Sequence, residues 1–275
     1  MWKLGTIGFG YPDWHGSVYP PDLREEDRLA AYAELYPAVE LDTTFYGIPR
    51  SETFLRWKRQ VSADFSFVLK APQSLTHSTP LIVGPAAEEW RTLSAGIEIL
   101  GPERSLILLQ FPPSFAATES GLLGRILEDF PAPCPRLVEL RHESWFVEST
   151  SALLEDHRCS WVASDLAPVG EAAHAPGTDG LGYRPLVPVH LGAVAYLRLC
   201  GVHAQFTQDS LELYDASPRI AWWLDQLGPL LGRQPRFLIA GNSFAGHAPG
   251  TLRRAARLLG QSEPTLAQPS LFGDF

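Results

Sequence analysis

Eight short apolar runs, separated by stretches with helical periodicity, constrain the fold of this sequence more than any other feature. The runs span 3–9, 38–44, 65–71, 105–111, 136–142, 160–165, 194–200 and 236–242. The helical stretches lie near 27–36, 51–61, 86–100, 118–130, 149–158, 217–231 and 249–260. Strands that are apolar on both faces and are joined by helices form parallel sheets covered by helices. Eight such units fit a TIM-like (β/α)8 barrel, which usually takes ~250 residues.

The expected domain covers residues 1–261, and residues 262–275 form a C-terminal tail. An open, doubly wound sheet is the alternative fold. It is disfavoured because the first turn, "GFGYPDWHG", does not lead from a GxGxxG loop into a helix, as dinucleotide-binding folds require. Residues 166–193 are rich in Pro, Gly and His and lack periodicity, so we expect a long loop there.

Polar side chains gather at the end of seven of the eight predicted strands. Residues two apart in a strand share a face, so the inward set can be read by parity. In a (β/α)8 barrel the carboxyl ends of the strands carry the binding and catalytic groups. The residues that this reasoning assigns to the site are Glu40, Asp42, Lys70, Gln110, Glu139, Arg141, Asp165, Tyr196, Arg198 and Asn242.

The charges in this set predict an anion site. Lys70, Arg141 and Arg198 would hold a phosphate or carboxylate group of a small ligand, since arginine offers a planar fork to such groups. For acid and base catalysis, Glu139 and Asp165 are candidate bases, and His77, in the loop after the third strand, is a candidate acid. In the competing interpretation the acids and cations only neutralise one another in structural ion pairs.

Five aromatic residues follow strands one, two and five: Tyr11, Trp14, Phe45, Tyr46 and Trp145. Such side chains can stack on a base or a sugar ring, as they do in single-strand binders. Packing at the rim of the barrel is the structural alternative for each of them. Around a centre of Arg and Lys, they would fit a nucleotide-like ligand.

Eight sequence blocks resemble the domain-of-unknown-function family 72, also called YecE-like. The blocks are "GTIGFGYPDW", "VELDTTFYGIP", "FSFVLKAP" followed by "LTH", "LILLQFPPSF", "VELRHESW", "YLRLCG" and "FLIAGNSFAGHAP". The resemblance implies a TIM-like barrel and no established reaction. Two positions depart from the family pattern, since Cys200 replaces a common histidine and Gly241 replaces the first of two asparagines.

Composition limits the class of function. The net charge is −9, from 22 basic and 31 acidic residues, which gives no overall attraction to nucleic acid or to anionic membranes. The three cysteines are unevenly spaced and odd in number, which favours a reducing, cytoplasmic location. No apolar segment is long enough to span a membrane. The eight histidines show no tight ligand spacing, so we predict no metal site, and no cofactor is indicated.

The segment Gln268 to Phe272, "QPSLF", resembles the short peptides with which bacterial replication and repair proteins bind the sliding clamp, except that Pro269 replaces the usual Leu. Packing of this tail on the barrel is the alternative. Three functions therefore stay open from the sequence. The first is an enzyme acting on a small anionic or phosphorylated substrate, the second a nucleic-acid-processing protein of the metal-assisted phosphodiesterase type, and the third a ligand-binding regulator.

Overall fold

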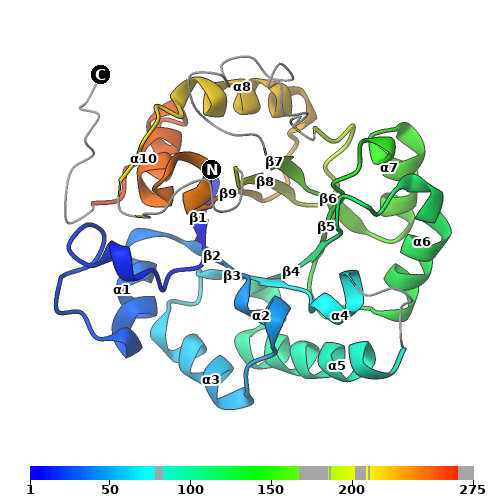
Figure 1. Cartoon of the computed structure of the whole chain (residues 1–275), viewed down its shortest axis with the longest axis horizontal. Coiled ribbons are helices and arrows are strands. Elements are labelled where there is room, and N and C mark those ends of the chain that lie inside the picture. Colours follow the sequence, from blue (N-terminus) through cyan, green and yellow to red (C-terminus); the bar gives the residue numbers. More distant parts are fainter. Residues whose placement is uncertain (78–82, 167–184, 186, 202–208, 210, 266–275) are drawn as a thin grey trace. The chain divides into compact units, whose positions relative to one another are not determined.

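Parallel strands alternate with helices along the whole chain (Figure 1). The structure is a computed structural model that describes residues 1–77, 83–166, 185, 187–201, 209 and 211–265. Most of the predicted loop at 166–193 and the segment Gln268 to Phe272 therefore lie outside the described residues. The chain forms two compact units. The first comprises Met1–Val39, Ala163–Val187 and Leu197–Phe275, and the second comprises Glu40–Val162 and Pro188–Tyr196.

The strands lie where the sequence predicts them. They are β1 (Trp2–Ile7), β2 (Ala38–Leu41), β3 (Ser66–Lys70), β4 (Ser105–Gln110), β5 (Arg136–Glu139), β6 (Cys159–Trp161), β7 (Ala163–Asp165), β8 (Ala195–Leu199) and β9 (Arg236–Ala240). Their order in the sheet is β6-β5-β4-β3-β2-β1-β9-β8-β7. With helices between the strands, this order belongs to the TIM-like α/β-barrel class that the sequence predicts.

The sixth predicted strand is divided into β6 and β7. Val162 separates them, and its backbone N–H donates to the carbonyl of Val138 in β5 at 3.0 Å. β6 pairs with β5, whereas β7 pairs with β8. The change of partner at one residue explains why nine strands are found where eight were expected.

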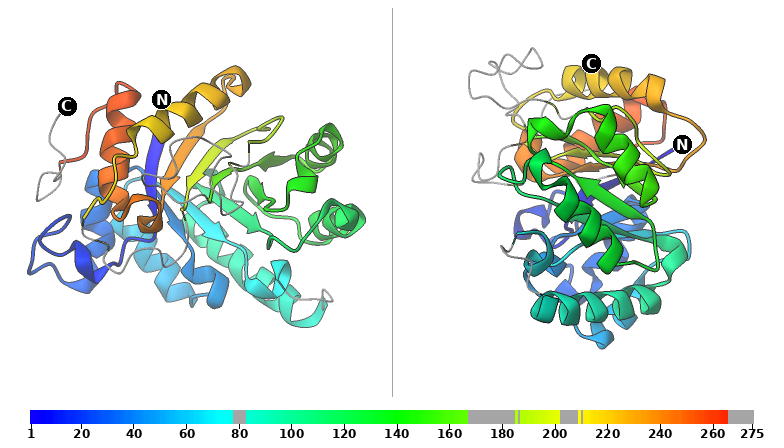
Figure 2. Two further views of the ribbon diagram at one scale, coloured as in Figure 1. Left: turned by 45° about the horizontal axis from the view of Figure 1, so that its top comes forward. Right: turned by 90° about the vertical axis from the view of Figure 1, so that its right-hand side faces the viewer.

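The long helices follow the predicted stretches. They are α1 (Arg28–Leu35), α3 (Ser51–Gln60), α5 (Val83–Leu100), α6 (Ser120–Asp129), α7 (Glu148–Asp156), α8 (Ser217–Leu227) and α10 (Ala248–Leu258). In the second unit, α5, α6 and α7 cover the outer side of the strands β4 to β6 (Figure 2). In the first unit, α10 packs on β1, β9 and α8. Strands β3 to β6 are buried almost throughout, as a sheet covered by helices requires.

Three short helices were not predicted: α2 (Thr43–Tyr46), α4 (Gln73–Thr76) and α9 (Asn242–Ala245). Each begins within three residues of the end of a strand. The assignment of Asp42, Arg141 and Asn242 to strands is wrong, because β2 ends at Leu41, β5 at Glu139 and β9 at Ala240. The parity rule does not apply to these three residues, and their positions depend on the turns that follow the strands.

Candidate functional site

The carboxyl ends of β3, β4 and β5 lie side by side in the second unit. The parallel register pairs Lys70 with Leu108 of β4, and Gln110 with Glu139 of β5. Parallel strands end at the same edge of a sheet, so the last residues of these three strands meet there. The polar residues that the sequence places at three separate positions are thereby brought together at one edge.

Glu139 and Arg141 form an ion pair at the end of β5. The Nε atom of Arg141 donates to Oε1 of Glu139 at 2.8 Å. The Glu139 side chain is fully buried, whereas the side chain of Arg141 is 21% exposed. A buried carboxylate needs such a partner, because an unpaired ion is costly to desolvate. Within the described part of the chain, neither Nη group of Arg141 has a partner, so these donors can bind a ligand.

Phe45 connects the other members of the cluster. The Nζ atom of Lys70 lies 3.9 Å from the centre of the Phe45 ring, a cation–π geometry. The His77 ring meets Phe45 edge-on at 4.9 Å, and the Tyr46 ring does so at 5.0 Å. Phe45 is buried, but Tyr46 is 78% exposed. The buried Phe45 ring thus contacts the ammonium group of Lys70, the imidazole of His77 and the exposed ring of Tyr46.

The hydrogen bonds of His77 define its tautomer. Gln110 donates from its amide nitrogen to the carbonyl of Phe111 at 3.2 Å, and the same nitrogen lies 3.3 Å from Nε2 of His77. An amide nitrogen can only donate, so Nε2 of His77 accepts and the proton sits on Nδ1. Nδ1 then donates to Oγ1 of Thr76 at 2.8 Å.

The environment keeps His77 neutral. Burial is the largest cause and lowers the pKa of His77 to about 4; Lys70 and Arg141 lower it further, and Glu139 raises it by less. The imidazole is therefore deprotonated at pH 7. This disfavours the predicted role of His77 as an acid in the ligand-free protein, and favours a role as a hydrogen-bond or proton acceptor.

Two more predicted residues meet in the second unit. The hydroxyl group of Tyr196, in β8, donates to Oε2 of Glu40 at 2.8 Å, and both side chains are fully buried. Asp42 lies just past β2 and is half-buried. The hydroxyl of Thr44 approaches the carbonyls of Leu41 at 2.9 Å and Lys70 at 2.6 Å, which attaches α2 to the end of β3.

Asp165, in the first unit, binds two residues of α8. Arg219 donates to both carboxylate oxygens, from Nε at 2.6 Å and from Nη2 at 3.2 Å, and Nε1 of Trp223 donates at 2.6 Å. All three side chains are buried. Both carboxylate oxygens are therefore engaged by groups of α8. These contacts favour a structural role for Asp165. The sequence gives no sign of its partners, which lie 54 and 58 positions away.

The remaining predicted residues of the first unit are also buried. Trp14 donates from Nε1 to the carbonyl of Asp209 at 3.1 Å and packs edge-on against His247. The side-chain oxygen of Asn242 accepts from the backbone N–H of Ala248 at 2.8 Å, at the start of α10. Arg198 is buried within β8. Trp14 and Asn242 therefore hold loops in place, and neither is part of the cluster in the second unit.

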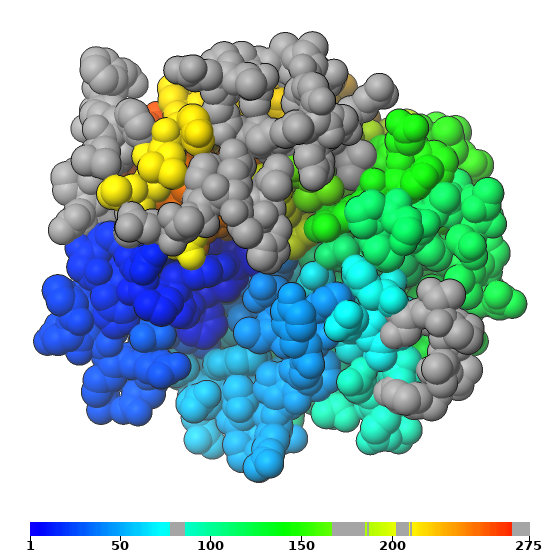
Figure 3. All heavy atoms as spheres, viewed as in Figure 1, coloured from blue at the N-terminus to red at the C-terminus, as the bar shows by residue number. Residues whose placement is uncertain are grey.

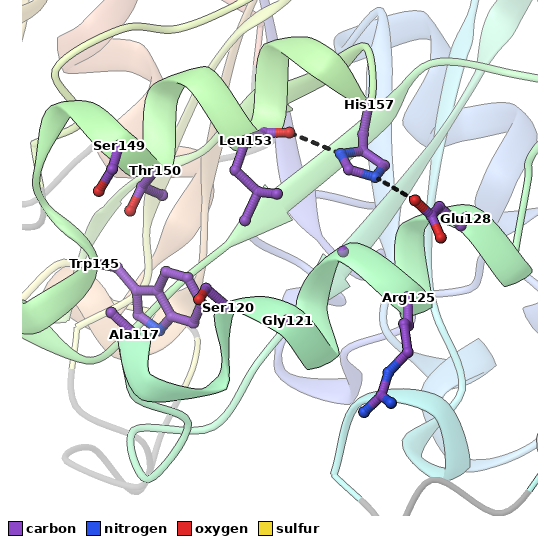
Figure 4. Close-up of a pocket in the computed structure, with 11 residues that line it drawn as sticks. Ala117, Ser120, Gly121, Arg125, Glu128, Trp145, Ser149, Thr150, Leu153 and His157 are labelled. Atoms are coloured by element: carbon purple, nitrogen blue, oxygen red, sulfur yellow. Dashed lines mark hydrogen bonds and ion pairs between the residues drawn. The ribbon is translucent and has the colours of Figure 1, made fainter.

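Trp145 lines a groove between α6 and α7 of about 500 Å³ (Figure 4). Its indole N–H donates to the carbonyl of Phe115, and its ring stacks on the ring of that residue at 5.4 Å. At the other end of the groove, His157 lies between the carbonyl of Leu153 and the carboxylate of Glu128. Trp145 is 1% exposed. It therefore packs the segment that follows β5 against Phe115, and its ring has no exposed face on which a ligand could stack.

No group of three or more His, Cys, Asp or Glu side chains that could hold a metal ion occurs among the residues that the structure describes. In the same residues, no helix combines the length and the apolar character needed to cross a membrane. All three cysteines, Cys134, Cys159 and Cys200, are free thiols. Burial raises the pKa of the Cys134 thiol to about 12 and that of Cys159 to about 11, so neither is an activated nucleophile.

The fold and the polar strand ends define an α/β protein of the TIM-like barrel class. The chain belongs to the family described as "Protein of unknown function DUF72", whose family model matches residues 3–271. This agrees with the resemblance seen in the sequence blocks, and it adds no reaction or substrate.

Curated relatives and solved structures agree with this assignment. The chain is 30% identical to UPF0759 protein YecE of Escherichia coli O157:H7 over 67% of its own length and 69% of the relative. It is also 30% identical to UPF0759 protein YunF of Bacillus subtilis, of which it spans only 52%. A DUF72 family structure from Thermotoga maritima matches with a TM-score of 0.72 at 26% identity, covering 95% of this chain and 100% of that one. One from Enterococcus faecalis matches in fold with a TM-score of 0.69 at 22% identity, covering 95% and 98%.

Proposed function

We propose that the carboxyl ends of β3, β4 and β5 bind a small anionic ligand through a phosphate or carboxylate group. Arg141 and Lys70 would hold that group. The observation that carries the proposal is the geometry of Arg141, whose Nε atom is fixed by the buried Glu139 carboxylate at 2.8 Å while its side chain stays 21% exposed. Lys70 and Arg141 both lower the pKa of His77, which agrees with positive charge at these strand ends. A half-buried site with a net positive field and two unpartnered guanidinium donors favours an anion.

The roles of the neighbouring residues follow from their contacts. Glu139 positions Arg141, since its carboxylate fixes the Nε end of the guanidinium. His77 is the proton acceptor if the bound ligand reacts, because its imidazole is neutral and Gln110 fixes the tautomer. These roles replace the expectation of Glu139 as the base and His77 as the acid. An enzyme acting on an anionic substrate and a regulator that only binds the ligand would share this pocket, and turnover distinguishes them.

The test is calorimetric titration of the full chain with inorganic phosphate and with ribose 5-phosphate. Arg141→Lys keeps a positive charge beside the buried Glu139 but removes the planar fork, so we expect about tenfold weaker binding, or about 1.4 kcal/mol. Arg125→Lys is the matched control, because Arg125 is an exposed arginine of α6 in the same unit. Equal affinities of Arg141→Lys and the unmodified protein, or an equal loss in Arg125→Lys, would reject the site.

A further inference from the structure

The exposure of Tyr46 sets it apart from the other aromatic residues in the described part of the chain. Among the residues that the structure describes, Tyr46 is the only exposed aromatic residue, at 78%. It belongs to α2, whose segment lies at the surface in the space-filling view (Figure 3). Aromatic side chains bury large apolar areas when they can, and Tyr46 stands exposed beside Phe45, the ring that contacts both Lys70 and His77, where a ligand can cover it.

The position of Tyr46 is fixed by its neighbours. Thr44, two residues earlier, hydrogen-bonds the carbonyl of Lys70, and Phe45 is buried between Lys70 and His77. The Tyr46 ring then stands at 90° to the Phe45 ring, with their centres 5.0 Å apart. Tyr46 and Nζ of Lys70 both contact the Phe45 ring. These two contacts limit the distance between the Tyr46 ring and Nζ of Lys70. A ring at Tyr46 and an anion at Lys70 can belong to one small molecule.

We propose that Tyr46 stacks on a planar ring of the ligand, and that the ligand is of the nucleoside monophosphate class, with its phosphate on Arg141 and Lys70. This inference rests on the proposed anion site and adds the ring to it. A sugar joins the base and the phosphate in such a ligand, and Tyr46 and Lys70 are likewise joined by their common contact with Phe45. Stacking of a base on an aromatic side chain contributes roughly tenfold or more to affinity.

A mononucleotide fits the whole chain better than a nucleic acid strand does. The net charge of the protein is −9, which repels a polyanion and lowers the affinity for every additional phosphate. One phosphate needs only the local cations, Arg141 and Lys70.

The test compares two ligands that differ only in the base, uridine 5′-monophosphate and ribose 5-phosphate, by calorimetry on the full chain. We expect the nucleotide to bind about tenfold more tightly to the unmodified protein. Tyr46→Ala should bring the ratio of the two affinities close to one, whereas Tyr46→Phe should keep it, because the ring and not the hydroxyl group stacks. Leu55→Ala, which removes an exposed apolar side chain of α3 in the same unit, should keep the ratio too.

The outcomes separate this inference from the anion site. If ribose 5-phosphate binds and Arg141→Lys weakens it, but the nucleotide binds no better, only the stacking role of Tyr46 is rejected. If neither ligand binds, both proposals fail. A thymidine octamer that binds more tightly than the mononucleotide, with a steep dependence on salt, overturns the mononucleotide class in favour of a nucleic acid. Since Tyr46 is exposed, its variants should keep the melting temperature of the unmodified protein.

Discussion

The Glu139–Arg141 pair determines how the site can be altered without unfolding it. Glu139 is fully buried, and Arg141→Ala would remove the arginine that pairs with its carboxylate at 2.8 Å. We expect this variant to lower the free energy of unfolding by about 3 kcal/mol. The double variant Glu139→Gln with Arg141→Gln removes both charges and should lower it by clearly less. Urea unfolding measures both values, and equal losses in the two variants would show that the buried charge is not the cause.

His77 should report the arrival of an anion. Its pKa is about 4 in the ligand-free protein because of burial, Lys70 and Arg141. A bound phosphate adds negative charge beside the ring and favours the imidazolium form, so the pKa of His77 should rise on binding. Titration of the imidazole by NMR, with and without ribose 5-phosphate, measures the change. A pKa near 6.5 without ligand, or one that does not move with ligand, would contradict the described environment.

At the scale of single residues, the sequence predicts which residues come close together only where the geometry of the strands determines their positions. Lys70, Gln110 and Glu139 are brought together because they end three adjacent parallel strands. The contact of Asp165 with Arg219 and Trp223 is different in kind. It joins a strand end to a helix far along the chain, and neither periodicity nor spacing in the sequence carries that information.

At the scale of elements, the apolar runs predict the strands but overestimate their length. The run at 38–44 was expected to be one strand, yet β2 ends at Leu41 and α2 begins at Thr43. Short helices such as α2 have too few residues to show a period of 3.6, so the turn is set by local contacts such as those of Thr44. The exposed position of Tyr46 is a consequence of this unpredicted turn.

Gly5 of β1 shows how tightly the strands pack in the first unit. A Cβ atom at this position would lie 2.2 Å from the carbonyl oxygen of Ala38. We expect Gly5→Ala to lower the free energy of unfolding by about 2 to 3 kcal/mol, since the backbone would have to move. Gly121→Ala is the control of opposite sign, because nothing lies near that position in the exposed first turn of α6, and it should stabilise by about 0.5 kcal/mol. Chemical denaturation measures the free energy of unfolding of both variants. Equal changes for Gly5→Ala and Gly121→Ala would show that β1 does not approach the Ala38 carbonyl so closely.

At the scale of the whole molecule, the order of elements and the charge were predictable, and the chemistry was not. The β/α alternation and its length determine the TIM-like class, and the family assignment agrees with it. Which polar residues act on a ligand depends on their pairing. Glu139 positions an arginine, Asp165 holds α8, and Trp145 packs a loop. A pattern of polar residues cannot distinguish these roles, because each of them places the same kinds of residue at strand ends.

Anion binding at Arg141 and Lys70 can be tested in crystals of the protein. Anomalous diffraction from crystals soaked in tungstate, a heavy analogue of phosphate, locates an anion directly. We expect a tungstate peak within hydrogen-bond distance of the Nη groups of Arg141 and close to Nζ of Lys70, and phosphate should displace it. Tungstate bound only at other surface positions, with none beside Arg141, would contradict it.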